Sequence, residues 1–277
     1  MKIYELRYSG TNTYLIEGEK GRILFDTGWA GTFPAFCRAA GEIGIPVQEM
    51  DYILLSHFHP DHMGIAQEIA ELGPVIVVME VQSAFIHESD AIFARNRKDH
   101  YIPIVDDKVR RLPMSDGRAF LKELGIDGEI LHTPGHSDDS ISLCLDDGTF
   151  FVGDLNPLYE LELHQGTEIG KTWARLLAMH PKTLYYGHAR KAVLENWENP
   201  GKYGEDQEAQ KHQRTEKDLY ALTVRIMKYI DKKNSLDQIR RKTGADRTFI
   251  EDVARMYLTH QNVGPQGILD RIEIKNR

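Results

Sequence analysis

The chain has 277 residues, of which 41% are hydrophobic and 27% are charged, a composition typical of a globular protein and not of a disordered or fibrous one. Its net charge of −8 argues against a whole surface built to hold polyanions, although it leaves room for a local basic patch. No run of about 18 apolar residues occurs, as a membrane-spanning helix would need, and the N-terminus lacks the layout of a secretory signal peptide. We therefore expect a cytoplasmic protein without a membrane partner. Its two cysteines, Cys37 and Cys144, are expected to stay reduced.

The first part of the chain is predicted to form short strands, turns and two helices. Turn dipeptides such as Glu17-Gly18 separate the apolar runs. Apolar residues at Ile65, Ile69 and Leu72 have helical spacing, and Gly73-Pro74 is a stop signal. The predicted strands are 2–8, 13–16, 22–26, 51–56 and 75–79, and the predicted helices are 34–40 and 62–72.

The middle of the chain continues this mixture of strands and helices. Residues 82–126 alternate between helical and loop character, and the strongest helix is expected at 117–124. Three strands follow at 129–132, 140–145 and 149–152, and Asp146-Asp147-Gly148 is a tight-turn signal between the last two. A helix at 171–179 leads to a strand at 183–186. The order of elements predicts an α/β fold.

The C-terminal part differs in composition. A charged and polar stretch at 196–218 is expected to be a linker or an exposed connection. An amphipathic helix follows at 219–230, then a helix at 235–242, a turn, a helix at 247–258 and two extended pieces around 264–274. This order is that of a winged helix. The predicted domains are therefore a catalytic domain at 1–195, the connection at 196–218 and a winged-helix-like region at 219–277.

The most informative stretch runs from Ser56 to His62, directly after an apolar strand. His57 and His59 point the same way in extended backbone and can grip one ion, while Asp61 and His62 lie at the turn into the next helix and can face a second centre. Imidazole and carboxylate ligands suit zinc, and iron or manganese is an alternative on chemical grounds. The stretch predicts a metal site.

Three later residues fall in similar places. His136, Asp154 and His188 each follow an apolar strand, and each has a glycine directly before it that lets the backbone bend. Any one of them alone could be a loop histidine, a helix cap or a core histidine. Together with the earlier motif they extend the predicted metal site.

The motif His57-x-His59-x-Asp61-His62, followed by His136, Asp154 and His188, resembles the metallo-β-lactamase superfamily in residue types, order and spacing. The resemblance covers roughly residues 3–190 and implies a four-layer αβ/βα sandwich with a metal pair at one edge. It implies that His57, His59 and His136 hold the first metal, that Asp61, His62 and His188 hold the second, and that Asp154 bridges both. Asp26 is then expected to orient one of these ligands without binding a metal itself.

The chemistry expected from this set is hydrolysis by two divalent ions, most readily Zn²⁺, with a bridging hydroxide as nucleophile. Asp61 is the candidate catalytic residue, because it can orient the hydroxide and accept its proton. The expected substrate is a small-molecule ester, thioester or lactone. Tyr159 and His164 are candidate substrate contacts, although a half-buried tyrosine and a surface histidine are the alternative interpretations.

A second hypothesis is a phosphodiesterase or ribonuclease whose C-terminal region binds nucleic acid, since Arg240, Arg241, Lys242 and Arg247 could contact phosphates. Nearby acidic residues and the acidic catalytic domain argue against it. The C-terminal region could instead cover the rim of the active site or form a homodimer. A binding scaffold without activity is disfavoured because the ligand set is complete.

Overall fold

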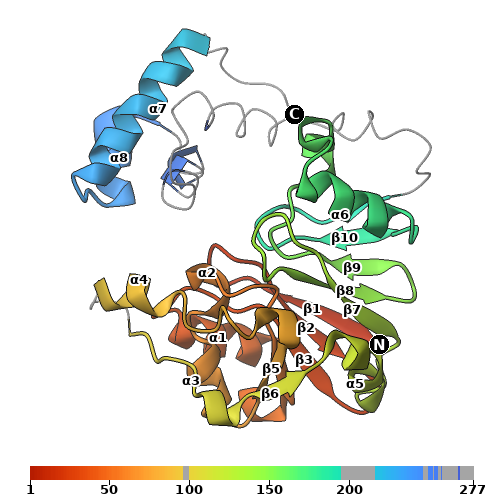
Figure 1. Ribbon diagram of the computed structural model, residues 1–277. Helices are drawn as coiled ribbons and strands as arrows, with labels where there is room; N and C mark the ends of the chain where they lie inside the picture. The colour runs from red at the N-terminus through yellow and green to blue at the C-terminus, as the bar shows by residue number, and fades with distance from the viewer. Residues whose placement is uncertain are drawn as a thin grey trace. The chain divides into compact units, whose positions relative to one another are not determined.

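The structure is a computed structural model of the chain (Figure 1), and it describes residues 1–95, 100–194 and 216–245, together with residues 249–251, 253, 254, 257 and 268. The chain divides into two compact units. The first comprises Met1–Pro157 and Leu161–Glu198, and the second comprises Leu158–Glu160 and Asn199–Arg277.

The first unit contains a six-stranded sheet in the order β1-β2-β3-β4-β5-β6. Strands β1 (Lys2–Leu6), β2 (Thr13–Glu17) and β3 (Arg22–Phe25) are antiparallel neighbours. Strands β4 (Tyr52–Leu54), β5 (Val75–Met79) and β6 (Arg110–Leu112) continue the sheet in parallel with β3. The parallel half brings the carboxyl ends of β3 and β4 to the same edge of the sheet.

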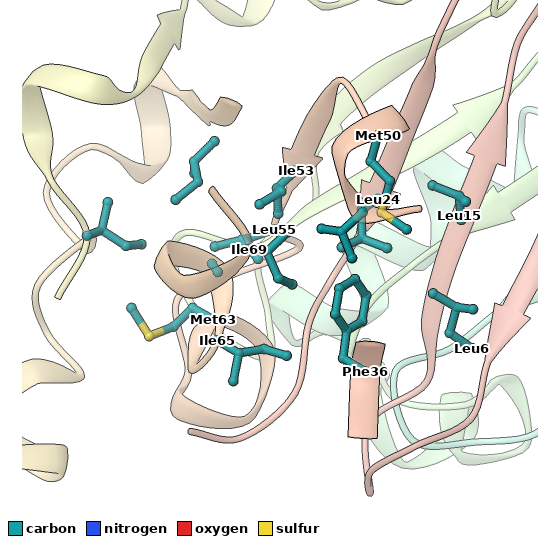
Figure 2. Close-up of a cluster of buried hydrophobic side chains, with 14 of the residues drawn as sticks. Leu6, Leu15, Leu24, Phe36, Met50, Ile53, Leu55, Met63, Ile65 and Ile69 are labelled. Atoms are coloured by element: carbon teal, nitrogen blue, oxygen red, sulfur yellow. The ribbon is translucent and has the colours of Figure 1, made fainter. Parts of the chain in front are cut away.

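One face of this sheet is covered by helices. Leu24 of β3, Ile53 of β4 and Leu55 directly after β4 join a core cluster with two helical residues, Phe36 of α1 (Phe33–Glu42) and Ile69 of α3 (Ala66–Ala70). Figure 2 shows these side chains between the strands and the helices. The period of two in the strand residues places every second side chain on this face.

The other face packs on a second sheet of five strands in the order β11-β10-β9-β8-β7. These strands are β7 (Gly128–His132), β8 (Ile141–Leu145), β9 (Thr149–Phe151), β10 (Thr183–Tyr185) and β11 (Ala192–Val193). The core between the sheets joins Ile23 and Phe25 of one sheet to Ile130, Leu143 and Phe151 of the other. Of the neighbouring pairs in the second sheet, β9 and β10 are parallel.

Helix α6 (Glu168–Leu177) lies outside the second sheet (Figure 1) and places the buried Trp173 against Tyr186, with ring centroids 6.4 Å apart. Helix α5 (Gly117–Glu123) contributes Phe120 and Leu121 to the core between the sheets. The shorter elements are α2 (Pro60–Met63), α4 (Asp90–Arg95) and the 3₁₀ helices Val47–Glu49, Glu80–Gln82, Asp106–Lys108, Met114–Asp116 and Leu158–His164. The architecture confirms the predicted αβ/βα sandwich.

The predicted helix at 62–72 is wrong in its extent. It is broken into α2 and α3, with Gly64 and Ile65 between them. A Cβ at Gly64 would meet the backbone of Gly28 and Ala30, so this turn is pressed against the loop after β3. The apolar spacing indicated a helical face correctly but not the break that this close approach imposes.

In the second unit, α7 (Glu216–Asp231) and α8 (Leu236–Thr243) confirm two predicted helices. Leu222, Ile226 and Ile239 form a core with Ala245 and other buried residues of this unit. Half of the predicted helix at 247–258, the extended pieces at 264–274 apart from Ile268, and most of the connection at 196–218 lie outside the described residues. The described residues of 247–258 are helical. Among the helices of the described residues, none is both long enough and apolar enough to cross a membrane.

Candidate metal centre

The candidate metal ligands gather where the strands of both sheets end. Asp26 directly follows β3, and His57 lies three residues after the end of the parallel strand β4. Asp154 and His188 follow the parallel strands β9 and β10 in the same way. The Ile141 N–H donates to the Ser56 carbonyl oxygen at 2.8 Å and so joins the edges of the two sheets.

The first group of ligands, called here the imidazole group, consists of His57, His59 and His136. One ligand atom from each lies within 4.8 Å of the others, and His59 Nδ1 is 3.0 Å from His136 Nε2. His57 is fully buried. Burial is the largest cause that lowers the pKa of His57 and of His59, so both rings are neutral at pH 7, as metal-binding imidazole must be.

The second group, called here the mixed group, consists of Asp61, His62 and His188. His188 Nε2 lies 2.9 Å from Asp61 Oδ2 and 3.2 Å from His62 Nε2. Burial lowers the pKa of His188, but attraction by Asp154 and Asp61 outweighs burial and raises that pKa to about 9. Burial raises the pKa of Asp61, but His62 and His188 outweigh it and lower that pKa to about 2.

Asp154 lies between the two groups. Its Oδ2 atom is 3.6 Å from His136 Nε2 of the imidazole group and 3.3 Å from His188 Nε2 of the mixed group. Its Oδ1 atom is 3.2 Å from His62 Nε2. One carboxylate therefore reaches ligand atoms of both groups.

The cluster fits cations. His57 Nε2 is buried and has no hydrogen-bond partner among the described residues. His188 Nδ1 lies 2.9 Å from the Gly10 carbonyl oxygen and His62 Nδ1 lies 3.0 Å from Asp26 Oδ2, so each of these ring nitrogens carries its hydrogen. The two Nε2 atoms therefore face each other at 3.2 Å. A proton or a metal ion between them is needed to avoid repulsion of two lone pairs, and a metal ion can be bound by both nitrogens together with the carboxylates.

Glycines make room for the cluster in two different ways. Gly135 and Gly153 have φ of 144° and 55°, so the prediction that the backbone bends there is confirmed. Gly187 is not among the positive-φ residues of the described chain. A Cβ at Gly187 would instead meet Asp154 Oδ1 and His62 Cε1. The chain bends at Gly187 as predicted, and the missing Cβ of this glycine also provides space for the ligands.

Two further residues, Ser56 and Asp139, support the ligands, and the sequence alone did not predict this. The Ser56 hydroxyl lies 2.8 Å from Asp26 Oδ2 and 2.9 Å from His57 Nδ1. The buried Asp139 accepts the Phe58 N–H at 2.7 Å and holds the segment between two ligands. Both lie next to recognisable motif residues, but only the fold brings their side chains to these partners. Asp26 contacts His62. A residue that orients a metal ligand must make such a contact.

The two candidate substrate contacts, Tyr159 and His164, both belong to the 3₁₀ helix Leu158–His164. The side chain of Tyr159 lies outside the described residues. His164 ends a 3₁₀ helix, and its carbonyl oxygen accepts the Thr167 N–H at 3.1 Å at the start of α6. His164 belongs neither to the imidazole group nor to the mixed group, nor to the third set of possible ligands among the described residues, which is His57, His62 and Asp154. A substrate contact by either residue stays a prediction.

The chain is similar to known proteins of one superfamily. The model of the metallo-beta-lactamase superfamily matches residues 6–188. The Beta-lactamase-like protein 2 homolog of Drosophila melanogaster is 29% identical over 192 residues, which are 65% of this chain and 58% of that protein. An atrochrysone carboxyl ACP thioesterase of Aspergillus fumigatus is 30% identical over 151 residues, 52% of this chain and 29% of that protein.

Among solved structures, a metallo-beta-lactamase family protein from Thermus thermophilus matches with a TM-score of 0.53 and 23% identity, over 69% of this chain and 74% of that chain. This likeness concerns the fold. The match to the family model spans the first ligand motif through His188, the last predicted ligand. The chain belongs to the metallo-beta-lactamase superfamily.

Proposed function

We propose that the chain is a metal-dependent hydrolase whose imidazole and mixed groups hold two divalent ions. The observation that carries the proposal is the position of Asp154, whose carboxylate reaches ligand atoms of both groups. The donors are imidazole nitrogens and carboxylate oxygens, which suit Zn²⁺ first and iron or manganese as alternatives.

Two such ions, when bound, supply hydroxide near neutral pH and polarise the oxygen of the bond to be cleaved. The protein must then orient the attacking oxygen. Asp61 suits this role because its Oδ2 atom faces His188 at 2.9 Å and its carboxylate is ionised at neutral pH. Thr11 fixes the backbone there by donating its hydroxyl to the Asp61 carbonyl oxygen at 2.6 Å. The low pKa of Asp61 makes it a weak base, so positioning is its main contribution.

The proposed substrate is a small molecule with an activated carbonyl group. A thioester is the preferred candidate, ahead of an ester or a lactone. Fungal relatives named atrochrysone carboxyl ACP thioesterase support this order. The net charge of −8 supports a small substrate over a long polyanion.

A second candidate activity is phosphodiester cleavage with nucleic acid held by the C-terminal unit. The observation in its favour is that Arg240 and Arg241 are exposed in the last turn of α8. Lys242 is engaged within its own unit, where its Nζ atom lies 2.5 Å from Asn234 Oδ1 and 5.0 Å from the centre of the Tyr229 ring. Two exposed arginines are a weaker basis than the ligand cluster.

The test is a parallel turnover screen of the metal-analysed full chain with an acyl thioester, a lactone, bis(p-nitrophenyl) phosphate and a short single-stranded RNA. The wild type is compared with Asp154→Ala. Turnover of the thioester or lactone that is lost in the variant supports the proposal. Cleavage of RNA or the phosphate diester with the same dependence favours the second candidate, and absence of all turnover by the metal-loaded wild type contradicts both.

A matched control is Asp147→Asn. Asp147 lies in the turn before β9, whereas Asp154 follows that strand, and Asp147 Oδ1 accepts the Thr149 N–H at 2.8 Å. Asparagine keeps this acceptor. We expect this variant to keep its metal and its turnover, so that a loss in Asp154→Ala is assigned to the ligand position and not to the removal of any acidic residue.

A further inference from the structure

Ser56 is the point where the supports of both ligand groups meet. Its hydroxyl oxygen lies 2.8 Å from Asp26 Oδ2, 2.9 Å from His57 Nδ1 and 3.4 Å from His62 Nδ1. Ser56 is 1% exposed, and Asp26, His57 and His62 are fully buried. No solvent is available to rearrange these contacts, so the protein itself must satisfy them.

Ser56 has a single hydroxyl hydrogen, and its position determines which atoms donate and which accept in these contacts. If it pointed at His57, two oxygens with lone pairs, Ser56 Oγ and the Asp26 carboxylate, would face each other at 2.8 Å. The hydrogen therefore goes to Asp26. Ser56 Oγ is then an acceptor toward His57, and His57 must carry its hydrogen on Nδ1. Its Nε2 atom is left with a free lone pair, and this is the buried atom that has no partner among the described residues.

The same carboxylate also orients the mixed group. Asp26 Oδ2 lies 3.0 Å from His62 Nδ1, so it accepts from this ring as well as from Ser56. Asp26 Oδ1 accepts the Ser56 N–H at 2.6 Å, which holds the two residues together at a second point. Asp26 itself has φ of 62°, a conformation that aspartate tolerates better than most residues.

We propose that Ser56 is a positioning residue that fixes the Nδ1–H tautomer of His57 and, through Asp26, couples the imidazole group to the mixed group. The buried carboxylate of Asp26 thereby directs the Nε2 lone pairs of His57 and His62 toward the two proposed metal positions. The inference rests on the proposed metal centre but not on the reaction or the substrate.

The packing around Ser56 leaves its hydroxyl little freedom to choose another partner. A Cβ at Gly153, which has φ of 55°, would lie 2.6 Å from both Ser56 Cβ and Oγ, so Gly153 approaches the serine closely from the side of the second sheet. The Ser56 carbonyl oxygen accepts from Ile141 N. These contacts and its own N–H bond to Asp26 fix the backbone on both sides of the hydroxyl.

The first test reads the tautomer in the zinc-loaded full chain. Nitrogen–proton correlation spectra of histidine-labelled protein identify which ring nitrogen carries hydrogen, and a His57→Gln variant assigns the His57 signals. We expect hydrogen on Nδ1 of His57, and we expect Ser56→Ala to speed its exchange with solvent. Hydrogen on Nε2 of His57 in the wild type would overturn the proposal, whether or not Ser56→Ala folds.

The second test measures metal affinity by competition with a zinc chelator. Ser56→Ala is expected to weaken binding of at least one zinc ion by about 10–100-fold, the usual effect of removing a partner that orients a ligand. The control is Ser142→Ala, because Ser142 is fully buried and bonds Thr133 Oγ1 at 2.8 Å rather than a predicted ligand. An equal loss in both variants, or no loss in Ser56→Ala, contradicts the positioning role. A wild-type chain that binds no zinc would instead contradict the proposed metal centre.

Discussion

The imidazole group and the mixed group lie side by side but differ in charge. In the imidazole group, burial lowers the pKa of His57 and His59 and keeps both rings neutral. In the mixed group, burial is outweighed by Asp154, Asp26 and Asp61, which raise the pKa of His62, and the pKa of His188 is raised to about 9. The first group offers the neutral imidazole rings of His57 and His59, whereas the second attracts positive charge.

The proposed pair of cations at this edge of the sandwich would depend on this difference in charge. A second cation beside the first is repelled unless anionic groups lie between or around them. The mixed group supplies Asp61, and Asp154 lies where both groups can share its charge. The imidazole group would therefore depend on the carboxylates of its neighbour, and we expect removal of the shared carboxylate to weaken metal binding more than removal of one that belongs to a single group.

The largest effect is expected for Asp154→Asn, which keeps the size of the side chain but removes the charge that both groups share. We expect weaker binding of both metal ions and a fall in turnover of about 1,000-fold, because several kcal/mol of transition-state stabilisation depend on the ions. Metal content after dialysis and the turnover of the best substrate measure this. Retention of two tightly bound ions would contradict this expectation, since Asp154 would then not be shared by the two groups.

Asp61→Asn tests a carboxylate that belongs to the mixed group alone. We expect the imidazole group to keep its metal while turnover falls by about 100-fold, the lower end of what a group that positions or transfers a proton contributes. Metal content and kcat on the same preparation separate the two effects. Full turnover with both metals bound would contradict the role assigned to Asp61.

The ligands in these groups differ in how well the sequence predicts them. His57, His59, Asp61 and His62 lie within six residues after an apolar strand, so their chemistry is visible without the fold. His136, Asp154 and His188 come from separate loops, and only the family resemblance assigned them to particular groups. Their meeting depends on the stacking of two sheets, which no local pattern encodes.

Other features of the site could not be predicted from local patterns. Ser56 acts through a hydroxyl whose partners lie 30 residues earlier and directly beside it in the chain. The break between α2 and α3 depends on the loop around Gly28, and no local propensity signals a contact between segments that are distant in sequence. The role of Gly187 likewise follows from Asp154 and His62, which approach it only in the folded chain.

Gly187→Ala would crowd the boundary between the two groups without changing a ligand. The added methyl group would meet Asp154 and His62, so we expect a loss in the free energy of unfolding of about 1–3 kcal/mol and weaker metal binding. Gly41→Ala is the matched control, because Gly41 lies in α1 and a Cβ there meets nothing within 4 Å. The control should keep its metal affinity and gain a little stability from helix propensity. Equal behaviour of the two variants in chelator titrations would show that Gly187 is not a spatial requirement of the site.

The smallest effect is expected in the pH dependence of unfolding of the chelator-treated chain, where the two groups act in opposite directions. The lowered pKa values of His57 and His59 mean that the unfolded chain binds more protons, so stability is lost as the pH falls below about 6.5. His188 has a raised pKa of about 9, so its contribution is fully present below pH 6.5 and is lost as the pH rises through about 9. Urea midpoints measured across this range should therefore decline on both sides. The zinc-loaded chain contains the same other titrating groups and is the control, because metal takes the place of the protons on these rings. If both forms decline equally toward pH 9, the positive charge attracted by the mixed group does not stabilise the fold, and the contrast between the two groups is confined to metal binding.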